Sequence, residues 1–348
     1  MSAGGAAALL EDVLAGRDLG EERAAAVMAD LMAGTTDPAV VAGLLVALRA
    51  RGETSAEVAG FVRAMTAAAT TVTLTEDLRG RAVDTCGTGG DGAGTVNVST
   101  VAAVVAAAAG VPVVKHGNRA ASSRAGSADL LEAWGVAIEL GPTAAAAVLD
   151  EVGATFLFAR AYHPAMRHVA PVRTALGVRT VFNVLGPLSN PAGVGRQVVG
   201  VADARTAGIV ADALARLGRT HALVVHGDDG LDELTTTTTS RVHEVRGGAV
   251  TTWTLDPADL GLPRARPEDL RGGDVATNRA LADEVLAGRE GPVADLVLLN
   301  AAAALVVGDA APDLGAGLAL ARAAVADGRA AAVRDRWVER SRARAAAA

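Results

Sequence analysis

The stretch Asp84–Thr100, DTCGTGGDGAGTVNVST, places five glycines within eight positions. The segment before it, RAVDT (81–85), predicts a short buried strand, and the segment after it, NVSTVAAVVAAAAG (97–110), predicts a helix. Glycine allows positive φ and lets the backbone approach a ligand closely. A strand, a glycine loop and a helix N-terminus are typical of a phosphate site, because free N–H groups point at the phosphate oxygens. The alternative is a long irregular turn, which seldom needs so many glycines.

Apolar segments alternate with Ala-rich segments of helical spacing beyond about residue 80. VPVVKH (111–116), HALVVHG (221–227) and ADLVLLN (294–300) are apolar segments that we predict as strands. Such alternation is typical of a mostly parallel sheet, which binds ligands beyond the carboxyl ends of its strands. The polar clusters KHGNR (115–119) and HGDDGLDE (226–233) follow two of these strands. We therefore expect both clusters beside the glycine loop.

The N-terminal part of the chain predicts short helices instead. Thr54 and Glu57, for example, have the spacing of a capping box. Helices this short need an apolar partner surface. We therefore predict an α/β fold with a small all-helical N-terminal domain, residues 1–72, and a larger α/β domain with a mostly parallel central sheet, residues 80–345. A helical segment at about 163–185 is expected to return to the small domain.

Composition and charge exclude several classes of protein. The formal net charge is −7 and no sustained basic block occurs, which argues against a nucleic-acid partner. The most apolar run, Val101–Val114, is too short to span a bilayer and contains Gly110 and Pro112, so we expect no membrane partner. The single cysteine, Cys86, precludes an intramolecular disulfide, and a cytoplasmic location fits it. We interpret Cys86 as a packing residue rather than a nucleophile.

The residues in and after the glycine loop limit the classes of phosphate ligand that it could bind. Gly87, Gly89 and Gly92 match the dinucleotide fingerprint G-x-G-x-x-G, but a single match is weak evidence. That class of site also needs an acidic residue at the end of the second strand, and this chain has Lys115 there. No Gly-Lys-Ser/Thr follows the glycines, so the loop is not a P-loop. The pattern indicates a phosphate site that is not typical of NAD or ATP.

Two further clusters carry candidate ligands. Asp228, Asp229, Asp232 and Glu233 follow a predicted strand, and adjacent carboxylates suit Mg²⁺ that also bridges to substrate phosphates. The alternative is a solvated acidic turn. In the helical segment before Gly177, Arg173 is a candidate clamp for a carboxylate, and the alternative is an ordinary surface arginine.

Six motifs together resemble the anthranilate phosphoribosyltransferases of tryptophan biosynthesis. They occur in family order over nearly the whole chain: GTGGD (87–91), NVST (97–100), KHGNRAASSRAGSADLLEAWGV (115–136), HPAMRHVAPVRTALGVRTVFNVLGPLSNPA (163–192), HGDDGLDELTTT (226–237) and VLLNAAAAL (297–305). The resemblance implies a pentosyltransferase. It would transfer the phosphoribosyl group of 5-phosphoribosyl-1-pyrophosphate (PRPP) to the amine of anthranilate, giving N-(5-phosphoribosyl)anthranilate and pyrophosphate.

The resemblance also implies which residues bind each ligand. The PRPP-binding positions would be Gly87, Gly90, Asp91, Thr95, Asn97, Val98, Ser99, Thr100, Lys115, His116, Gly117, Asn118, Arg119, Ala120, Ala121, Ser122, Ser123 and Ser127. The anthranilate-binding positions would be Gly87, Asn118, His163 and Arg173. The Mg²⁺ cofactor would be held by Ser99, Asp232 and Glu233. A homodimer formed through the helical domain is expected as well.

The expected chemistry agrees with these residue types. Negative charge grows on the departing pyrophosphate, so magnesium, N–H donors and Lys115 as a charge stabiliser are the groups required. An aromatic amine is neutral at pH 7, so we assign no general base. A pyrimidine nucleoside phosphorylase is the nearest enzymatic alternative, and a catalytically silent relative that binds nucleic acid is the alternative from another class.

Overall fold

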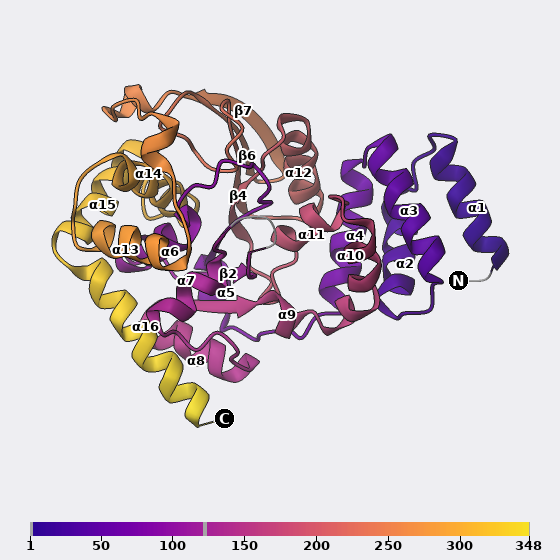
Figure 1. Ribbon diagram of the computed structural model, residues 1–348, viewed down its shortest axis with the longest axis horizontal. Helices are drawn as coiled ribbons and strands as arrows, with labels where there is room; N and C mark the ends of the chain where they lie inside the picture. Colours follow the sequence, from indigo (N-terminus) through magenta and orange to yellow (C-terminus); the bar gives the residue numbers. More distant parts are fainter. Residues whose placement is uncertain (1–2, 121–123, 348) are drawn as a thin grey trace.

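The computed structural model describes residues 3–120 and 124–347, and the described chain begins with four helices that form a small bundle (Figure 1). These are α1 (Ala3–Leu14), α2 (Gly20–Met32), α3 (Pro38–Arg51) and α4 (Ser55–Ala67). Asp37 caps α3 by accepting a hydrogen bond from the N–H of Ala39 at 2.8 Å, and a proline follows at the first helical position. Leu44, Leu45 and Phe61 are buried in the bundle. The predicted helical start is confirmed.

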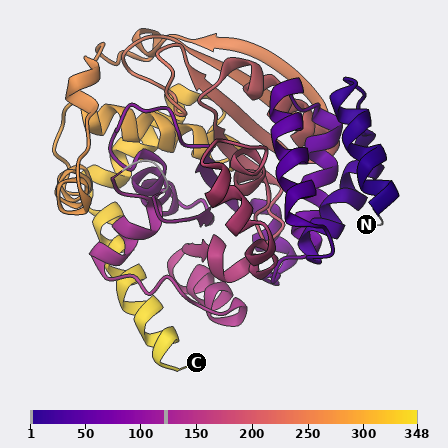
Figure 2. The same cartoon turned by 45° about the vertical axis from the view of Figure 1, so that its right-hand side comes forward.

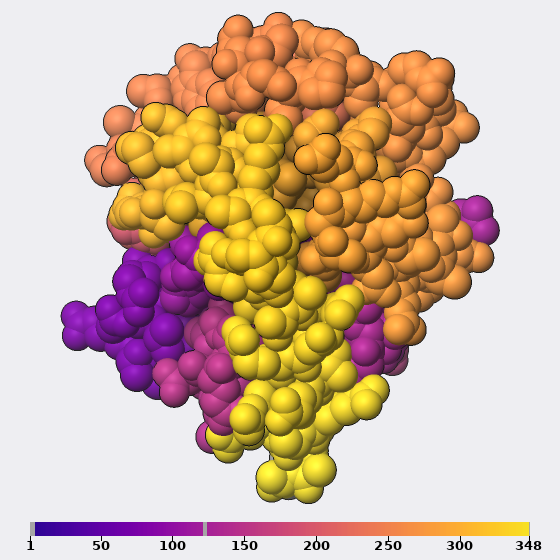
Figure 3. Space-filling view, turned by 90° about the vertical axis from the view of Figure 1, so that its left-hand side faces the viewer, coloured from indigo at the N-terminus to yellow at the C-terminus, as the bar shows by residue number. Residues whose placement is uncertain are grey.

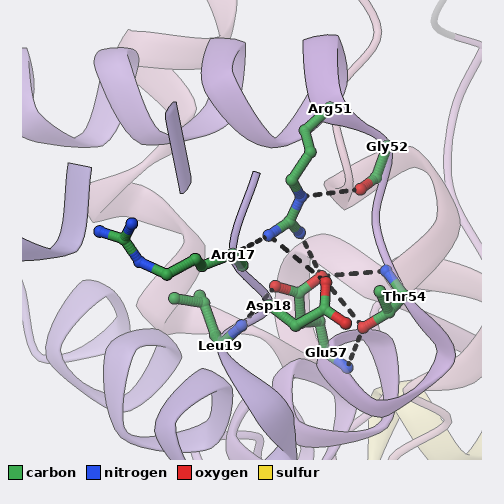
Figure 4. Close-up of polar contacts among 7 residues, drawn as sticks. All are labelled: Arg17, Asp18, Leu19, Arg51, Gly52, Thr54 and Glu57. Carbon is green, nitrogen blue, oxygen red and sulfur yellow. Dashed lines mark hydrogen bonds and ion pairs between the residues drawn. The ribbon is translucent and has the colours of Figure 1, made fainter. Parts of the chain in front are cut away.

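Glu57 joins three of these helices (Figure 4). Its buried carboxylate accepts hydrogen bonds from the N–H of Leu19 at 3.0 Å, from the N–H of Thr54 at 2.9 Å and from the guanidinium of Arg51. Burial alone would raise the pKa of Glu57, but these hydrogen bonds, with Arg51 foremost, lower it below its ordinary value. The predicted capping box is therefore also a buried ion pair that ties the start of α2 and the end of α3 to the start of α4.

A sheet of seven described strands forms the centre of the larger domain, in the order β3-β2-β1-β4-β5-β6-β7. Strands β1 to β5 pair in parallel, and β6 and β7 extend the sheet as an antiparallel hairpin. The strand order reverses at β1, which is where parallel sheets bind ligands. The strands are β1 (Val83–Gly87), β2 (Val113–Gly117), β3 (Ala154–Phe158), β4 (Arg196–Gly200), β5 (His221–Gly227), β6 (Ser240–Arg246) and β7 (Ala249–Leu255).

Helices cover both faces of the sheet (Figures 1 and 2). The apolar cluster on one face includes α6 (Val98–Ala108), α7 (Ser127–Trp134), α8 (Pro142–Val152), α13 (Val275–Leu286), α14 (Pro292–Val307), α15 (Leu314–Ala326) and α16 (Arg329–Ala346). The cluster on the other face includes the N-terminal bundle, α10 (Ala170–Leu176), α11 (Phe182–Leu188) and α12 (Ala204–Arg216). Figure 3 shows α16, in yellow, running along the outer surface toward the C-terminus.

Short helical segments complete the described chain. They are α5 (Glu76–Arg81), α9 (Ala159–Tyr162) and the 3-10 segments η1 (Pro164–His168), η2 (Pro257–Leu260) and η3 (Pro267–Leu270). No helix in the described ranges is long and apolar enough to cross a membrane.

One predicted strand is wrong. Residues 294–300 lie inside helix α14, which begins with Pro292 at its first turn and is buried along almost its whole length between α6 and α15. A helix that is apolar on all sides leaves no helical periodicity in its sequence, so a short piece of it resembles a buried strand. The apolar run continues to Val307, well beyond the usual length of a strand.

Candidate active site

The glycine loop, residues 88–96, joins β1 to α6 and needs its glycines. Gly89, Gly90, Gly92 and Gly94 have φ between 60° and 78°, a region that other residues rarely adopt. A Cβ on Gly87, the last residue of β1, would lie 2.4 Å from Oδ2 of Asp232. The N–H of Gly89 donates to this same oxygen at 2.7 Å. The predicted strand, glycine loop and helix are confirmed as elements, and a carboxylate from beyond β5 lies against the loop.

Helix α6 presents its N-terminus to the loop without a side-chain cap. Asn97 occupies the N-cap position, but its amide donates to the carbonyl of Ala125 at 2.9 Å and its side-chain oxygen accepts from Asn278 at 2.9 Å. The Asn97 side chain therefore does not accept from the first N–H groups of α6. The N–H groups of Val98 and Thr100 donate to backbone carbonyls at 2.8 and 3.2 Å, and the positive end of the helix dipole favours an anionic group at this position.

Lys115 lies on β2 with its side chain almost completely buried. Its ammonium group donates to the carbonyl of Thr85 and, at 3.1 Å, to Oγ of Ser99 on the first turn of α6. Burial lowers the pKa of Lys115, and neighbouring acidic groups, with Asp84 foremost, oppose that shift. The side-chain nitrogen of Lys115 therefore lies at the N-terminus of α6.

Asp232 and Glu233 follow β5 and face this nitrogen. Burial raises the pKa of Asp232 to about 6, and the nearby charge of Asp91 adds to the effect. Burial also raises the pKa of Glu233 well above its ordinary value, with a further contribution from Asp232. Neither carboxylate has a lysine, arginine or histidine within 4.0 Å among the residues that the structure describes, in contrast to the buried pair of Glu57 and Arg51.

These groups fit a magnesium ion. Ser99, Asp232 and Glu233 offer hard oxygen donors, and two adjacent, partly buried carboxylates without an ion-pair partner are stabilised by a cation. The described ranges contain no group of three or more His, Cys, Asp or Glu that could hold a metal by themselves. Magnesium commonly uses one or two carboxylates and completes its shell with water and substrate phosphates.

Asp228 and Asp229, the other two carboxylates of this cluster, are used in the turn itself. Asp229 accepts hydrogen bonds from the hydroxyl of Thr235 at 2.6 Å and from that of Thr237. Asp228 accepts one from the hydroxyl of Thr239. Each of the two interpretations therefore holds for part of the acidic stretch. Asp228 and Asp229 stabilise a turn, whereas Asp232 lies against the glycine loop.

Two buried histidines lie side by side at the end of β2. The ring centroids of His116 and His163 are 5.1 Å apart, and Nδ1 of His116 is 3.1 Å from the carbonyl oxygen of Gly186. Nε2 of each ring is buried and has no hydrogen-bond partner among the described residues. Burial lowers the pKa of His116 to about 3 and that of His163 to about 4. Both rings are therefore neutral at pH 7, with one polar atom each left over for a ligand or water.

Arg173 lies on α10 with its guanidinium 5.3 Å from the ring centroid of Phe182, a cation–π contact. Burial lowers the pKa of Arg173, and no carboxylate of the described residues lies within 4.0 Å of it. Pro171 is in the first turn of α10, a position that tolerates proline. Arg173 is thus a partly buried positive charge without an acidic partner, as a carboxylate clamp requires.

The structure describes some of the predicted PRPP-binding residues that follow Lys115 and His116. The N–H of Ala128 donates to the carbonyl of Asn118 at 3.2 Å, which places Asn118 beside Ser127 at the start of α7. Arg119 pairs with Glu132 and lies 5.5 Å from the ring centroid of Phe158. The N–H of Ala120 donates to Asp129 at 3.0 Å, and Gly117 ends β2. Ala121, Ser122 and Ser123 lie outside the described residues.

The remaining predicted positions belong to the loop and to the first turn of α6. Asp91 accepts a hydrogen bond from a backbone N–H of the loop at 3.2 Å, and Thr95 forms an isolated antiparallel bridge with Arg271. Val98 and Thr100 are buried, and the hydroxyl of Thr100 has no partner within the described chain. These residues set the shape of the loop around the uncapped helix end.

Sequence reasoning missed Asp84, which is fully buried on β1. Its carboxylate accepts from the N–H of His116 at 3.0 Å and from the amide of Asn190 at 2.9 Å. Burial raises the pKa of Asp84 to about 6. Asp84 therefore fixes the end of β2, from which Lys115 and His116 project. A carboxylate inside an apolar strand is the signal that could have identified it.

Comparison with known proteins gives the same result over both domains. Residues 7–69 match the helical bundle domain of a glycosyl transferase family, and residues 79–331 match the a/b domain of that family. Anthranilate phosphoribosyltransferase of Chloroflexus aggregans is 54% identical over 320 residues, which are 91% of this chain and 93% of the relative. The enzyme of Rubrobacter xylanophilus is 50% identical over 334 residues, 96% of each chain.

Solved structures agree with these relatives. Anthranilate phosphoribosyltransferase of Thermus thermophilus superposes with a TM-score of 0.89 at 49% identity, covering 96% of this chain and 99% of that one. The enzyme of Saccharomyces cerevisiae in complex with PRPP and Mg gives 0.89 at 25% identity, covering 98% and 99%. The resemblance found in the motifs is confirmed, and this chain belongs to the anthranilate phosphoribosyltransferase family of tryptophan biosynthesis.

Proposed function

We propose that this protein transfers the phosphoribosyl group of PRPP to the amine of anthranilate, releasing pyrophosphate. The observation that carries the proposal is the meeting of three features at the switch point of the sheet: the N-terminus of α6, the buried ammonium of Lys115, and the partly buried carboxylates of Asp232 and Glu233. They are the groups that a pyrophosphate leaving group requires, and family membership supplies the acceptor.

The protein's part in the reaction is binding, orientation and charge stabilisation. The amine nitrogen forms a bond to the anomeric carbon as the bond from that carbon to the pyrophosphate oxygen breaks, and the amine proton passes to solvent. Lys115 and the N–H groups of the loop stabilise the charge on the departing pyrophosphate. Holding the amine, carbon and leaving group in line contributes up to about 7–11 kcal/mol.

Ser99, Asp232 and Glu233 would hold Mg²⁺ in this proposal. Bound magnesium neutralises part of the charge on the pyrophosphate. The yeast enzyme was solved in complex with PRPP and Mg, which supports this cofactor. For the acceptor we propose Arg173 as the clamp of the anthranilate carboxylate, with Gly87, Asn118 and His163 lining its site. The unpaired charge of Arg173 and the unpartnered Nε2 of His163 support this assignment.

The domain division, assembly and location are part of the same proposal. The two matched family domains, residues 7–69 and 79–331, support a division at residues 1–72 and 80–345, and contact of α10 with α3 supports the return of residues 163–185 to the small domain. Leu14 and Val46 are exposed on α1 and α3 and would be covered in a homodimer formed through the bundle. Light scattering that finds a monomer at micromolar concentration would contradict the dimer. The family's biosynthetic role and the single thiol, Cys86, support a cytoplasmic location.

Release of pyrophosphate from PRPP tests the proposed reaction directly. We expect release with anthranilate and Mg²⁺, and none with benzoate, which lacks the amine. Thymidine with inorganic phosphate is the matched test for the nucleoside phosphorylase alternative, and we expect no phosphorolysis. Release with another amine and none with anthranilate would overturn the proposed acceptor.

A further inference from the structure

Arg179 lies within the motif of residues 163–192, but the sequence assigned no binding role to it. It lies in the turn before α11, and its guanidinium is in contact with Gly90 of the glycine loop. A Cβ on Gly90 would be 1.6 Å from Nη1 of Arg179, so only glycine allows this approach. Nη2 of Arg179 donates to the carbonyl of Thr88 at 3.3 Å. Two atoms of one side chain therefore border the loop that is shaped for a phosphate.

The charge of Arg179 has no acidic partner. No carboxylate among residues 3–120 and 124–347 lies within 4.0 Å of its guanidinium, although the side chain is partly buried. The hydrogen bond to Thr88 uses one of the five N–H donors of a guanidinium. The fork of the remaining donors matches the oxygens of a phosphate. A group needed only to brace the loop would not require a full unpaired charge.

The N-terminal bundle holds the backbone of Arg179 in place. Nη1 of Arg49, on α3, donates to the carbonyl of Arg179 at 2.6 Å. On the other side, the N–H of Thr180 donates to the side chain of Asn183 at 2.9 Å. Position 179 is thus fixed by α3 and by the start of α11. A chain of two hydrogen bonds, from Arg49 to the backbone of Arg179 and from its side chain to Thr88, thus connects the bundle to the glycine loop.

Arg179 is also close to the proposed metal ligands. Burial dominates the raised pKa of Asp232, the charge of Asp91 raises it further, and the charge of Arg179 opposes the rise. The N–H of Gly89 donates to Asp232, and the next residue, Gly90, borders the guanidinium of Arg179, so both side chains lie at the same part of the loop. A ligand that met the carboxylates through a cation would bring its phosphate oxygens toward Arg179.

We propose that Arg179 is a phosphate-contacting residue of the donor site, which binds the pyrophosphate part of PRPP, and that Arg49 is a positioning residue that holds it there. This inference rests on the proposed function. It makes the N-terminal bundle a contributor to binding of PRPP, through Arg49.

Binding of inorganic pyrophosphate with Mg²⁺, measured by calorimetry, tests Arg179 without turnover. Arg179→Gln keeps a polar N–H donor but has no charge and a shorter reach, and we expect it to weaken pyrophosphate binding at least about tenfold. Arg179→Lys keeps the charge without the fork, so it should recover part of that loss. Arg336→Gln, on the exposed surface of α16, is the matched control and should bind like the wild type.

Steady-state kinetics separates this role from a structural one. Arg179→Gln should raise the KM for PRPP by a similar factor and leave the KM for anthranilate within about twofold. Arg49→Met should raise the KM for PRPP by a smaller factor. The double variant should be no worse than Arg179→Gln alone, because Arg49 acts through Arg179.

Two results would overturn the inference. The first is equal affinity of the wild type and Arg179→Gln for pyrophosphate, which would contradict the role of Arg179. The second is a rise in the KM for PRPP of the double variant that equals the product of the two single rises, which would contradict the role of Arg49. Failure of the proposed function looks different: the wild type itself would bind neither PRPP nor pyrophosphate.

Discussion

Replacing Gly90 by alanine tests whether the shape of the glycine loop places Arg179. Gly90 has φ of +78° and its Cβ would lie 1.6 Å from Nη1 of Arg179. Gly92 has φ of +72° and nothing within 4 Å of its Cβ. Gly90→Ala and Gly92→Ala therefore share the backbone strain and differ in the displacement of the guanidinium.

The two costs can be separated by size. A left-handed alanine costs roughly 1–2 kcal/mol, and both variants should lose about this much stability. In Gly90→Ala the guanidinium must also retreat by about 2 Å to regain an ordinary contact. If that movement breaks a charged hydrogen bond to phosphate worth about 1.5–3 kcal/mol, the KM for PRPP rises by about 10-fold to 100-fold.

The assay is the initial rate against PRPP concentration at saturating anthranilate, with the melting temperature of each variant as a control for folding. We expect Gly92→Ala to keep its KM for PRPP within about threefold, and Gly90→Ala to show the larger rise. Equal KM values for the two variants would refute the reasoning, because the clash with Arg179 would then have no effect on the donor site.

Three other changes separate the acceptor, the metal and the helical bundle. Arg173→Ala should raise the KM for anthranilate at least about tenfold and leave that for PRPP nearly unchanged, as measured by steady-state kinetics; a change in the PRPP value instead would contradict its assignment. Asp232→Asn with Glu233→Gln should lower turnover and raise the Mg²⁺ concentration needed for half-maximal rate. If this double variant instead raised only the KM for anthranilate, as Arg173→Ala should, the division of the site into metal and acceptor residues would be wrong. Glu57→Gln should cost about 3 kcal/mol in urea unfolding at pH 7, because Arg51 loses its buried partner. Since the folded pKa of Glu57 is lowered, this contribution is present above about pH 4.5 and is lost as the pH falls through the folded value, so the variants should converge in acid; a difference that persists at low pH would contradict the ion pair.

Local signals were enough to predict the elements that bear the site. The glycines of the loop and the capping box of Thr54 and Glu57 each act within a few residues, so their spacing is visible in the chain. Cys86 is buried, and its thiol lies 3.4 Å from the carbonyl of Pro187, as expected for a packing residue.

The missed features depend on contacts between distant parts of the chain. Arg179 meets Gly90 and Asp84 meets Asn190 only because the segments before and after α11 lie against β1 and the glycine loop in the fold. Asp228 and Asp232 are both aspartates and lie only four positions apart. Only the tertiary structure shows that Asp228 accepts a hydrogen bond from Thr239 of the turn, whereas Asp232 accepts one from the glycine loop. The helix at 294–300 was mistaken for a strand because burial on all sides removes its periodicity.

The fluorescence of anthranilate, followed after addition of PRPP, is the most direct measurement of the proposed transfer. We expect the fluorescence to fall only when protein, PRPP and Mg²⁺ are all present, and excess chelator to stop the fall. Constant fluorescence with folded protein under all of these conditions would contradict the proposed transfer.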